Sequence, residues 1–405
     1  METSTTMRPV IPPSEPERST RRRDRRVPGF RPGGEFSVGV EEELMLLRPD
    51  GALSARQPGE VVAAVQEVVG SACAVTSEIF TAQVEFATPV CARAEEAVEA
   101  LRQARRALRA LGQPAAAGGV HPRAGLGDFR TTASPRYDLI VADLAGFLRT
   151  PTAALQVHVG MPDEVTAVAA YRGLRHHLAV LRALAAASPH WHGRDSGLAC
   201  SRGAVLRSYP RTGVPPAFRS WAEYECRTQA VVDGSGVPNH TYLWWDLRPR
   251  PDLGTLEVRV MDAQWSLELV AGLVALVQGL AVAAADRPPA GDLPDAVLDE
   301  NDFQAVRHGL DAQVVDADGR RRPVRGLAVE LVREARSALG TLGPGREEPL
   351  AGLLAALAGE EESRRQRRVR AERGLGGLVA DLADRTGSPL PSPTAPRRRM
   401  RAEVG

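Results

Sequence analysis

Acidic and arginine side chains recur in short apolar segments of strand-like composition, spread over more than two hundred residues of the chain. The segments are Gly39–Glu43, Val84–Phe86, Trp245–Arg248 and Glu257–Asp262. A charge inside an apolar strand is costly unless a partner compensates it. A bound metal ion and a phosphate group would both do so. The pattern therefore predicts an enzyme that handles Mg²⁺ and a nucleotide.

The alternation of these strands predicts which charges lie together. Side chains two residues apart share a face of a strand, so Glu41 projects beside Glu43, and Glu257 beside Arg259. Glu42 falls among the apolar positions of the other face, which predicts a bulge or a place at the sheet edge. A solvated outer face is the plain alternative. Carboxylates and arginines dominate the polar positions here, which favours a binding site.

Four of the carboxylates suit a hard divalent cation, because Mg²⁺ takes oxygen ligands from a few carboxylates and from substrate phosphates. The predicted metal ligands are Glu41, Glu43, Glu85 and Glu257.

Arginine supplies a planar fork that matches the oxygens of phosphate or carboxylate groups. The candidates for this role are Arg202, Arg248 and Arg259. His158 shares a face of its strand with Gln156. A structural histidine and a functional one are about equally well supported there.

Composition limits the alternatives. The chain has 405 residues and 43% hydrophobic residues, enough for a substantial core. It contains no lysine, which excludes Schiff-base chemistry and a phosphate-loop lysine. Its net charge of +1 argues against extensive contact with nucleic acid. The four cysteines form no CxxC pair, which favours a reducing cytoplasm over a zinc site or a disulfide framework.

The longest apolar run, Leu267 to Ala285, contains Glu268 and Gln278 and is predicted as a buried helix in preference to a membrane span. Residues 1–33 and 387–405 are rich in Pro and Arg and are predicted as disordered tails. The arginine-rich run 21–26 could contact nucleic acid, but a solvated tail is the stronger interpretation.

Residues 34–386 are predicted as a single catalytic domain of the α+β class. Strands are expected near 35–47, 79–87, 155–161, 242–248 and 255–262, and helices at 59–69, 92–111, 134–143, 163–187 and beyond 266. Hairpin-like pairs come early and helices cluster late. That order favours an antiparallel sheet with helices packed outside it over a doubly wound parallel sheet.

Taken in order, the motifs resemble the bacterial carboxylate–amine ligases called glutamate–cysteine ligase type 2, within the glutamine synthetase superfamily. The matching segments are Gly39–Glu43, Gln83–Glu85, Gly119–Pro122, Gln156–Gly160, Ala187–Pro189, Gly193–Gly197, Trp245–Pro249, Gly254–Asp262, Glu300–Asp302 and His308–Ala312. They cover roughly residues 35–385.

The resemblance implies a curved antiparallel sheet whose concave face forms the active site, and an ATP-dependent reaction. ATP would phosphorylate the γ-carboxylate of glutamate, and the amine of cysteine would attack the acyl phosphate. By position, the four glutamates would hold Mg²⁺. The implied catalytic residues are Arg259, Arg202, Asp246 and Arg248, and the implied nucleotide-binding residues are His158, Gln156 and Thr255.

One departure concerns substrate choice. Relatives often carry His-x-His where this chain has Gln156-Val157-His158, so a neutral amide replaces one potential ligand. Two alternatives therefore stay open: the same chemistry on a different acid and amine, and a nucleotide-binding protein without catalysis. The expected partners are small amino-acid substrates and neither membrane nor nucleic acid, and a homo-oligomer is possible.

Overall fold

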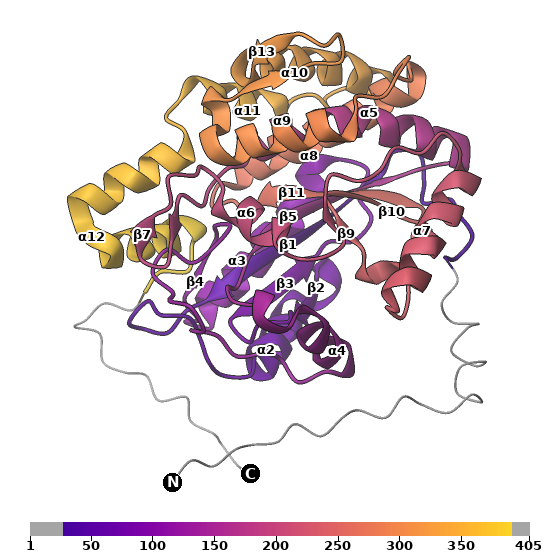
Figure 1. Ribbon diagram of the computed structural model, residues 1–405. Coiled ribbons are helices and arrows are strands. Elements are labelled where there is room, and N and C mark those ends of the chain that lie inside the picture. Colours follow the sequence, from indigo (N-terminus) through magenta and orange to yellow (C-terminus); the bar gives the residue numbers. More distant parts are fainter. Residues whose placement is uncertain (1–26, 391–405) are drawn as a thin grey trace, which may run out of the picture.

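An antiparallel sheet forms the centre of the computed structural model, which describes residues 27–390 (Figure 1). Its strands are β1 (Val38–Leu46), β2 (Ala74–Ser77), β3 (Gln83–Ala87), β4 (Ala115–Ala116), β5 (Ala154–Gly160), β10 (Leu247–Arg250) and β11 (Thr255–Asp262). Their order is β10-β11-β5-β1-β3-β2, and β4 pairs with the end of β1. All of these pairings are antiparallel, and helices lie outside them. The predicted α+β architecture is confirmed.

The remaining elements surround this sheet. Three short strand pairs are β6 (His190–Trp191) with β7 (Arg194–Asp195), β8 (Thr212–Gly213) with β9 (Trp244–Trp245), and β12 (Gln313–Val315) with β13 (Arg321–Pro323). The α-helices are α2 (Gly59–Val69), α3 (Ala94–Ala110), α4 (Pro135–Leu144), α5 (Glu164–Leu184), α6 (Ser201–Arg207), α7 (Trp221–Ser235), α8 (Leu267–Asp286), α9 (Asp295–His308), α10 (Val324–Thr341), α11 (Leu350–Ala358) and α12 (Glu362–Thr386). Single 3₁₀ turns are η1 (Gly70–Ala72), η2 (Ala145–Phe147), η3 (His240–Tyr242) and η4 (Gly309–Asp311).

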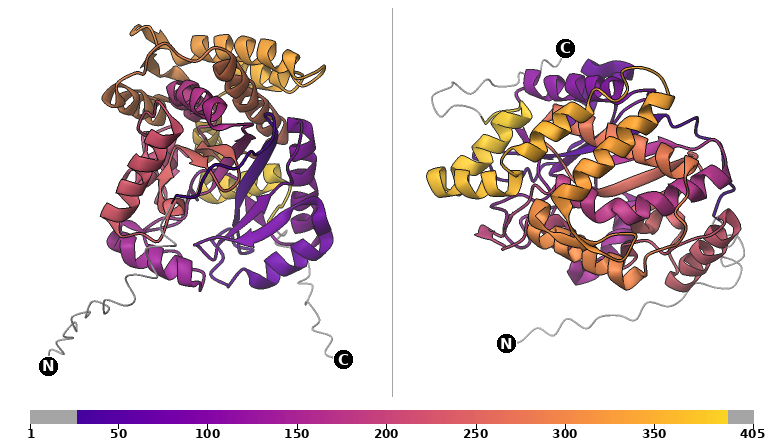
Figure 2. Two further views of the ribbon diagram at one scale, coloured as in Figure 1. Left: turned by 90° about the vertical axis from the view of Figure 1, so that its right-hand side faces the viewer. Right: turned by 90° about the horizontal axis from the view of Figure 1, so that it is seen from above.

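Helices α3, α5 and α8 cover one face of the sheet, and α10 and α11 stack outside α8 (Figure 2). Within residues 27–390, α8 is the one helix long and apolar enough to cross a membrane, and 83% of its most apolar window is buried inside the protein. Its polar Gln278 is used internally, since the side-chain amide donates to the carbonyl oxygens of Phe36 (2.7 Å) and Ala92 (3.2 Å). These contacts fit the predicted core helix.

The bulge or edge position predicted for Glu42 is wrong. Glu42 lies inside β1 in regular register, opposite Phe86 on one side and Leu155 on the other. Its fully buried carboxylate instead forms a two-pronged ion pair with Arg105 of α3, with Nε 2.9 Å from one oxygen. Arg105 also donates to the carbonyl oxygen of Trp265. The face that carries Glu42 is therefore the helix-covered one, and Glu41 and Glu43 must point the other way.

Part of the predicted N-terminal tail lies against the sheet. Residues 27–33 run beside the loop between β10 and β11, where the amide of Arg31 donates to the carbonyl oxygen of Pro251 (3.0 Å). Gly254 allows this approach, because its φ is +65° and a Cβ there would lie 1.9 Å from the carbonyl oxygen of Arg31. The rest of that tail, with the arginine run 21–26, lies outside the described residues.

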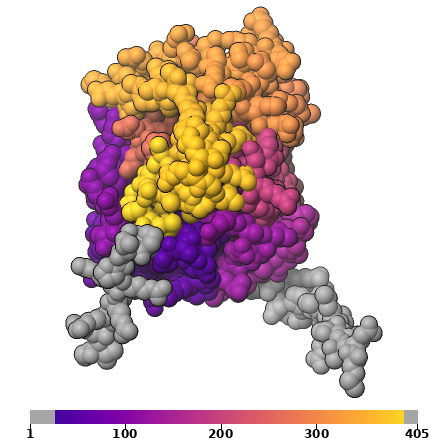
Figure 3. All heavy atoms as spheres, turned by 90° about the vertical axis from the view of Figure 1, so that its left-hand side faces the viewer, coloured from indigo at the N-terminus to yellow at the C-terminus, as the bar shows by residue number. Residues whose placement is uncertain are grey.

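The C-terminal helix α12 covers the face of the molecule shown in Figure 3, between the N-terminal half and the later helices. The Thr386 hydroxyl accepts from the Ala117 amide (2.9 Å), and the Ser388 carbonyl oxygen accepts from the Ala115 amide (3.2 Å). The chain is thus tied to β4 beyond residue 387, where the tail was expected to start. Residues 391–405 lie outside the described part.

Candidate active site

A cavity of about 310 Å³ opens on the face of the sheet opposite α3, α5 and α8. Its polar part is formed mainly by Glu41, Glu43, Glu78, Glu85, Arg202 and Arg259. Its apolar wall is formed by Tyr137, Ile140, Leu144, Leu148, Tyr209 and Trp244. The cavity thus places clustered carboxylates, guanidinium groups and an apolar surface around one space.

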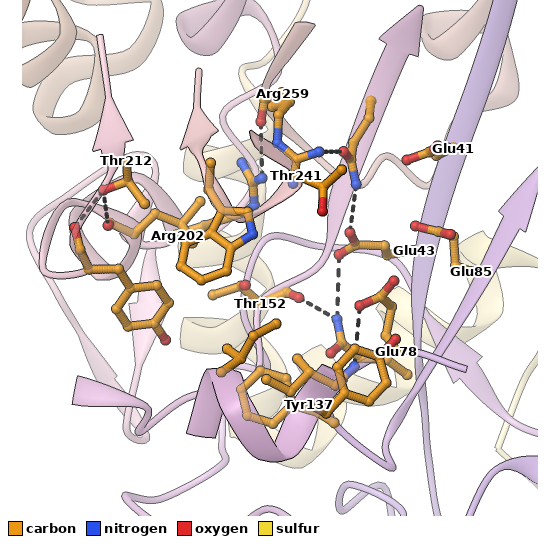
Figure 4. Close-up of a pocket in the computed structure, with 18 of the residues that line it drawn as sticks. Glu41, Glu43, Glu78, Glu85, Tyr137, Thr152, Arg202, Thr212, Thr241 and Arg259 are labelled. Carbon is orange, nitrogen blue, oxygen red and sulfur yellow. Dashed lines mark hydrogen bonds between the residues drawn. The ribbon is translucent and has the colours of Figure 1, made fainter. Parts of the chain in front are cut away.

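Strand register brings the carboxylates together (Figure 4). Glu43 on β1 lies directly opposite Glu85 on β3, and Glu41 lies opposite Gln156 on β5. Glu78 joins them from the turn between β2 and β3, although its side chain was not among the predicted ligands. No ion pair involves Glu43, Glu78 or Glu85 within the described part of the chain. Three acids therefore share one site without a direct ion pair to a protein cation in that part of the chain.

The acids show the effect of this crowding. Burial, and then the charge of Glu78, raises the pKa of Glu43 from 4.5 to about 8. Burial and the neighbouring charges of Glu78 and Glu41 raise the pKa of Glu85 well above its usual range. Burial likewise raises the pKa of Glu78. A set of buried carboxylate oxygens without direct ion pairs is a donor set that fits Mg²⁺.

These pKa shifts predict how pH affects the metal-free protein. A carboxyl whose folded pKa is raised holds its proton more tightly when folded, so stability falls as pH rises between about 4.5 and 8. We expect the melting temperature in EDTA to fall across this window, and Mg²⁺ to restore it most strongly near pH 8. Glu43→Gln removes one titrating group and should flatten the slope. Equal slopes of melting temperature against pH for the wild type and Glu43→Gln would contradict the raised pKa of Glu43.

A second cluster lies beside the cavity, where one ligand atom each from Glu41, His158 and Glu257 lie within 4.8 Å of one another. His158 Nε2 is 3.3 Å from a Glu41 oxygen, and its Nδ1 lies 2.9 Å from the Thr255 hydroxyl. Burial raises the pKa of Glu41, but the hydrogen bond and charge of His158 outweigh it and lower the pKa overall. His158 and Thr255 thus orient a carboxylate at the edge of the cavity.

Glu257 is already compensated by arginines. Its fully buried carboxylate accepts both prongs of Arg248, at 2.9 and 3.1 Å, and also bonds to Arg259. Burial raises the pKa of Glu257, but the charges of Arg248 and Arg259 lower it well below its usual range. Glu257 is therefore ionised, and part of its capacity to accept hydrogen bonds is taken up by these two arginines.

Two predicted catalytic residues line the cavity with their polar groups largely occupied. Besides Glu257, Arg248 donates to the carbonyl oxygens of Thr241 (3.0 Å) and Leu243 (3.1 Å). Asp246 accepts from the buried Arg182 at 2.9 Å. These contacts support the cavity wall and leave few free groups for a ligand.

Arg202 is different. It is 3% exposed, and its Nη2 donates to the carbonyl oxygen of Arg259 at 3.0 Å. Its Nε and Nη1 are buried and have no hydrogen-bond partner among residues 27–390. Burial lowers the pKa of Arg202. Buried donors without acceptors are costly, so this fork is poised for an anionic ligand in the cavity.

Arg259 lies at an irregularity in β11, where the register shifts between Val258 and Met261 and two residues of β11 oppose one residue of β5. Its side chain shares the cavity face with Glu257, as strand alternation predicts. Arg259 bonds to the Gln156 side-chain oxygen, and the Gln156 amide donates to Glu43 at 2.8 Å. Gln156 therefore links the arginine to the acid cluster.

Sequence reasoning missed Glu78 and the apolar wall. Glu78 lies outside the strands, so strand alternation gave no signal for it. The wall comes from α4, from the residues that follow η2 and α6, and from β9, segments far apart in the chain. One signal was present: in α4, Tyr137, Ile140 and Leu144 follow helical spacing, which marks one apolar face.

Comparisons with known proteins agree with this geometry. The family model described as Glutamate-cysteine ligase family 2 (GCS2) matches residues 37–371. A Glutamate--cysteine ligase of Haloferax volcanii is 33% identical over 85% of this chain and 96% of its own length. A Rubrobacter xylanophilus protein, named provisionally as a glutamate–cysteine ligase 2-1, is 34% identical over 82% of this chain and 90% of its own. A solved Glutamate--Cysteine Ligase of Francisella tularensis shares the fold, with a TM-score of 0.64 and 11% identity over 89% of this chain and 94% of its own.

Proposed function

The chain belongs to glutamate–cysteine ligase family 2, and from this premise we propose that it is an ATP-dependent ligase that joins glutamate to cysteine. The reaction would convert the two amino acids and ATP into γ-glutamylcysteine, ADP and phosphate. The observation that carries the proposal is one cavity that combines four uncompensated or partly compensated glutamates with Nε and Nη1 of Arg202, two buried donors that have no hydrogen-bond partner among residues 27–390. We also propose residues 34–386 as a single catalytic domain.

The acid cluster is assigned to metal binding. Glu41, Glu43 and Glu85 would hold Mg²⁺ together with Glu78, and Glu257 would contribute from the edge of the cavity. Bound there, Mg²⁺ would neutralise charge on the phosphate oxygens of ATP. The Francisella ligase of the same fold binds AMP, which supports a nucleotide as the partner of this site.

The arginines are assigned to the reacting groups. A phosphoryl group passes from ATP to the glutamate γ-carboxylate, and the amine then displaces phosphate from the acyl phosphate. Negative charge on the transferred oxygens must be held while this occurs. Arg202 has free donors for that role, and Arg259 lies beside it at the bulge of β11. The apolar wall would exclude water, which would otherwise hydrolyse the acyl phosphate.

The other predicted residues would act by orientation. His158 of β5 holds Glu41 and is itself held by Thr255 of β11, and Gln156 holds Glu43. We propose that they shape the nucleotide and metal end of the cavity through these carboxylates. Asp246 and Arg248 would hold the wall through their bonds to other protein groups.

A second acid and amine pair is supported by the size of the apolar wall. Cysteine has a small side chain, whereas Ile140, Leu144, Leu148 and Trp244 present an extended apolar surface. An amine with a larger apolar side chain would bury more of that surface, at roughly 25 cal/mol per Å².

The test is product formation by the full chain with ATP, Mg²⁺ and glutamate, using cysteine and a panel of larger apolar amines. We expect ADP release that requires all of the components, with the amide product identified by mass spectrometry. Glu43→Gln should remove turnover, because it takes an anionic ligand from the cation site. ADP release with another amine and none with cysteine would favour the second pair. Nucleotide binding without turnover on any pair would overturn the ligase assignment in favour of a sensor.

A further inference from the structure

Three residues from the sequence motifs, Ser188, Asp262 and Asp302, lie outside the cavity lining and contact α6 or the residue that precedes it, and α6 is the short helix that carries Arg202. Ser188, in the motif Ala187–Pro189, bonds to the first turn of α6. Asp262, at the end of β11, accepts from the thiol of Cys200, the residue that precedes the helix, at 3.2 Å. Asp302 lies 3.6 Å from Arg207 at the other end of α6.

Ser188 is the centre of this arrangement. Its carbonyl oxygen accepts from the Ser201 amide at 2.8 Å, and its hydroxyl accepts from the Arg202 amide at 3.2 Å. The same hydroxyl donates to Asp262 at 2.7 Å. A hydroxyl has one proton and two lone pairs. Because Asp262 takes the proton, the lone pairs of Ser188 face the amide of Arg202.

The helix depends on these contacts for its place. It has seven residues, and so short a helix gains little stability by itself. Gly203 lies against Val306 and Arg182, where a Cβ would meet atoms at 2.6 and 3.0 Å, so the space on that side is full. The aim of the Arg202 fork into the cavity therefore follows from how the first turn of α6 is held.

We propose that Ser188, held by Asp262, is a positioning residue for Arg202 in the ligase reaction. The proposal rests on the proposed function only for its kinetic readout. Within residues 27–390, Arg202 is the one cavity-lining residue that is hydrogen-bonded to Ser188, through its backbone amide, so Ser188 acts through the direction of that side chain. The local order of α6 is a separate readout that needs no turnover.

The matched pair of variants is Ser188→Ala and Ser201→Ala. Both serines are buried, and both changes remove one hydroxyl beside the same helix turn. The Ser201 hydroxyl bonds to Ser196 at 2.9 Å. We expect Ser188→Ala to lower kcat/KM about ten- to a hundredfold, the range for a misplaced reacting group, and Ser201→Ala to remain near wild type. In an Arg202→Ala background, Ser188→Ala should cause no further loss.

Hydrogen exchange gives the second readout. Peptides covering residues 199–207 should exchange faster in Ser188→Ala than in Ser201→Ala, while the remaining peptides and the melting temperature stay similar in the two variants. Equal exchange in the two variants, or a kinetic loss that persists in the Arg202→Ala background, would overturn the proposal. A wild type without turnover would overturn the ligase function alone, and the exchange result would still decide the role of Ser188.

Discussion

Arg202→Ala is expected to lower kcat/KM by about 10²–10³-fold, the loss seen when a single preorganised donor to a developing anion is removed. The residue presents two buried donors, Nε and Nη1, that no group among residues 27–390 accepts. Without an acceptor these buried donors destabilise the folded protein, and an anion in the cavity would accept charge-assisted hydrogen bonds from them. The measurement is steady-state ADP release with saturating Mg²⁺.

The same variant should not lose stability, in contrast to its loss of kcat/KM. Burial lowers the pKa of Arg202, so the folded state disfavours its charge, and alanine removes that cost. We expect the melting temperature of Arg202→Ala to equal or exceed that of the wild type, as at sites where function is kept at the expense of stability. The control is Arg368→Ala on the protein surface, where the side chain pairs with Glu360 at 2.8 Å. Full activity in Arg202→Ala, or equal losses in both variants, would contradict the role.

The contrast between two arginines shows what strand patterns can and cannot predict. Arg248 and Arg202 were both predicted as forks for phosphate or carboxylate. Their residue type and segment were enough to place both at the cavity. The partners that decide whether a fork is free come from elsewhere: Glu257 and the carbonyl oxygens of Thr241 and Leu243 occupy Arg248. Nothing in the local sequence of either arginine encodes those contacts.

The carboxylates divide in the same way. The period of a strand was sufficient to predict that Glu41 and Glu43 project together, and register then added Glu85. The burial of Glu42 depends on a partner 63 residues away, Arg105, on helix α3. The place of Glu78 in the cavity depends on the fold of the turn between β2 and β3, which strand periodicity does not predict. Periodicity fixes the face of a side chain, whereas its neighbours depend on packing between distant segments.

Glu257→Ala is expected to abolish turnover and also to destabilise the fold by about 3–5 kcal/mol, the cost of leaving a buried charge unpaired. The fully buried carboxylate compensates Arg248 and Arg259 together, so its removal leaves both guanidinium groups without their main anion. Urea unfolding, monitored by fluorescence, measures the second effect, and ADP release measures the first.

The two effects can be separated by changing the arginine as well. Glu257→Met with Arg248→Met removes the charge pair and keeps the volume, so it should recover part of the lost stability while turnover stays absent. Glu360→Ala is the matched surface control, because Glu360 accepts both prongs of the exposed Arg368, and water replaces that carboxylate readily. If the double variant recovered turnover along with stability, Glu257 would serve only to neutralise the arginines and would have no part in binding the cation.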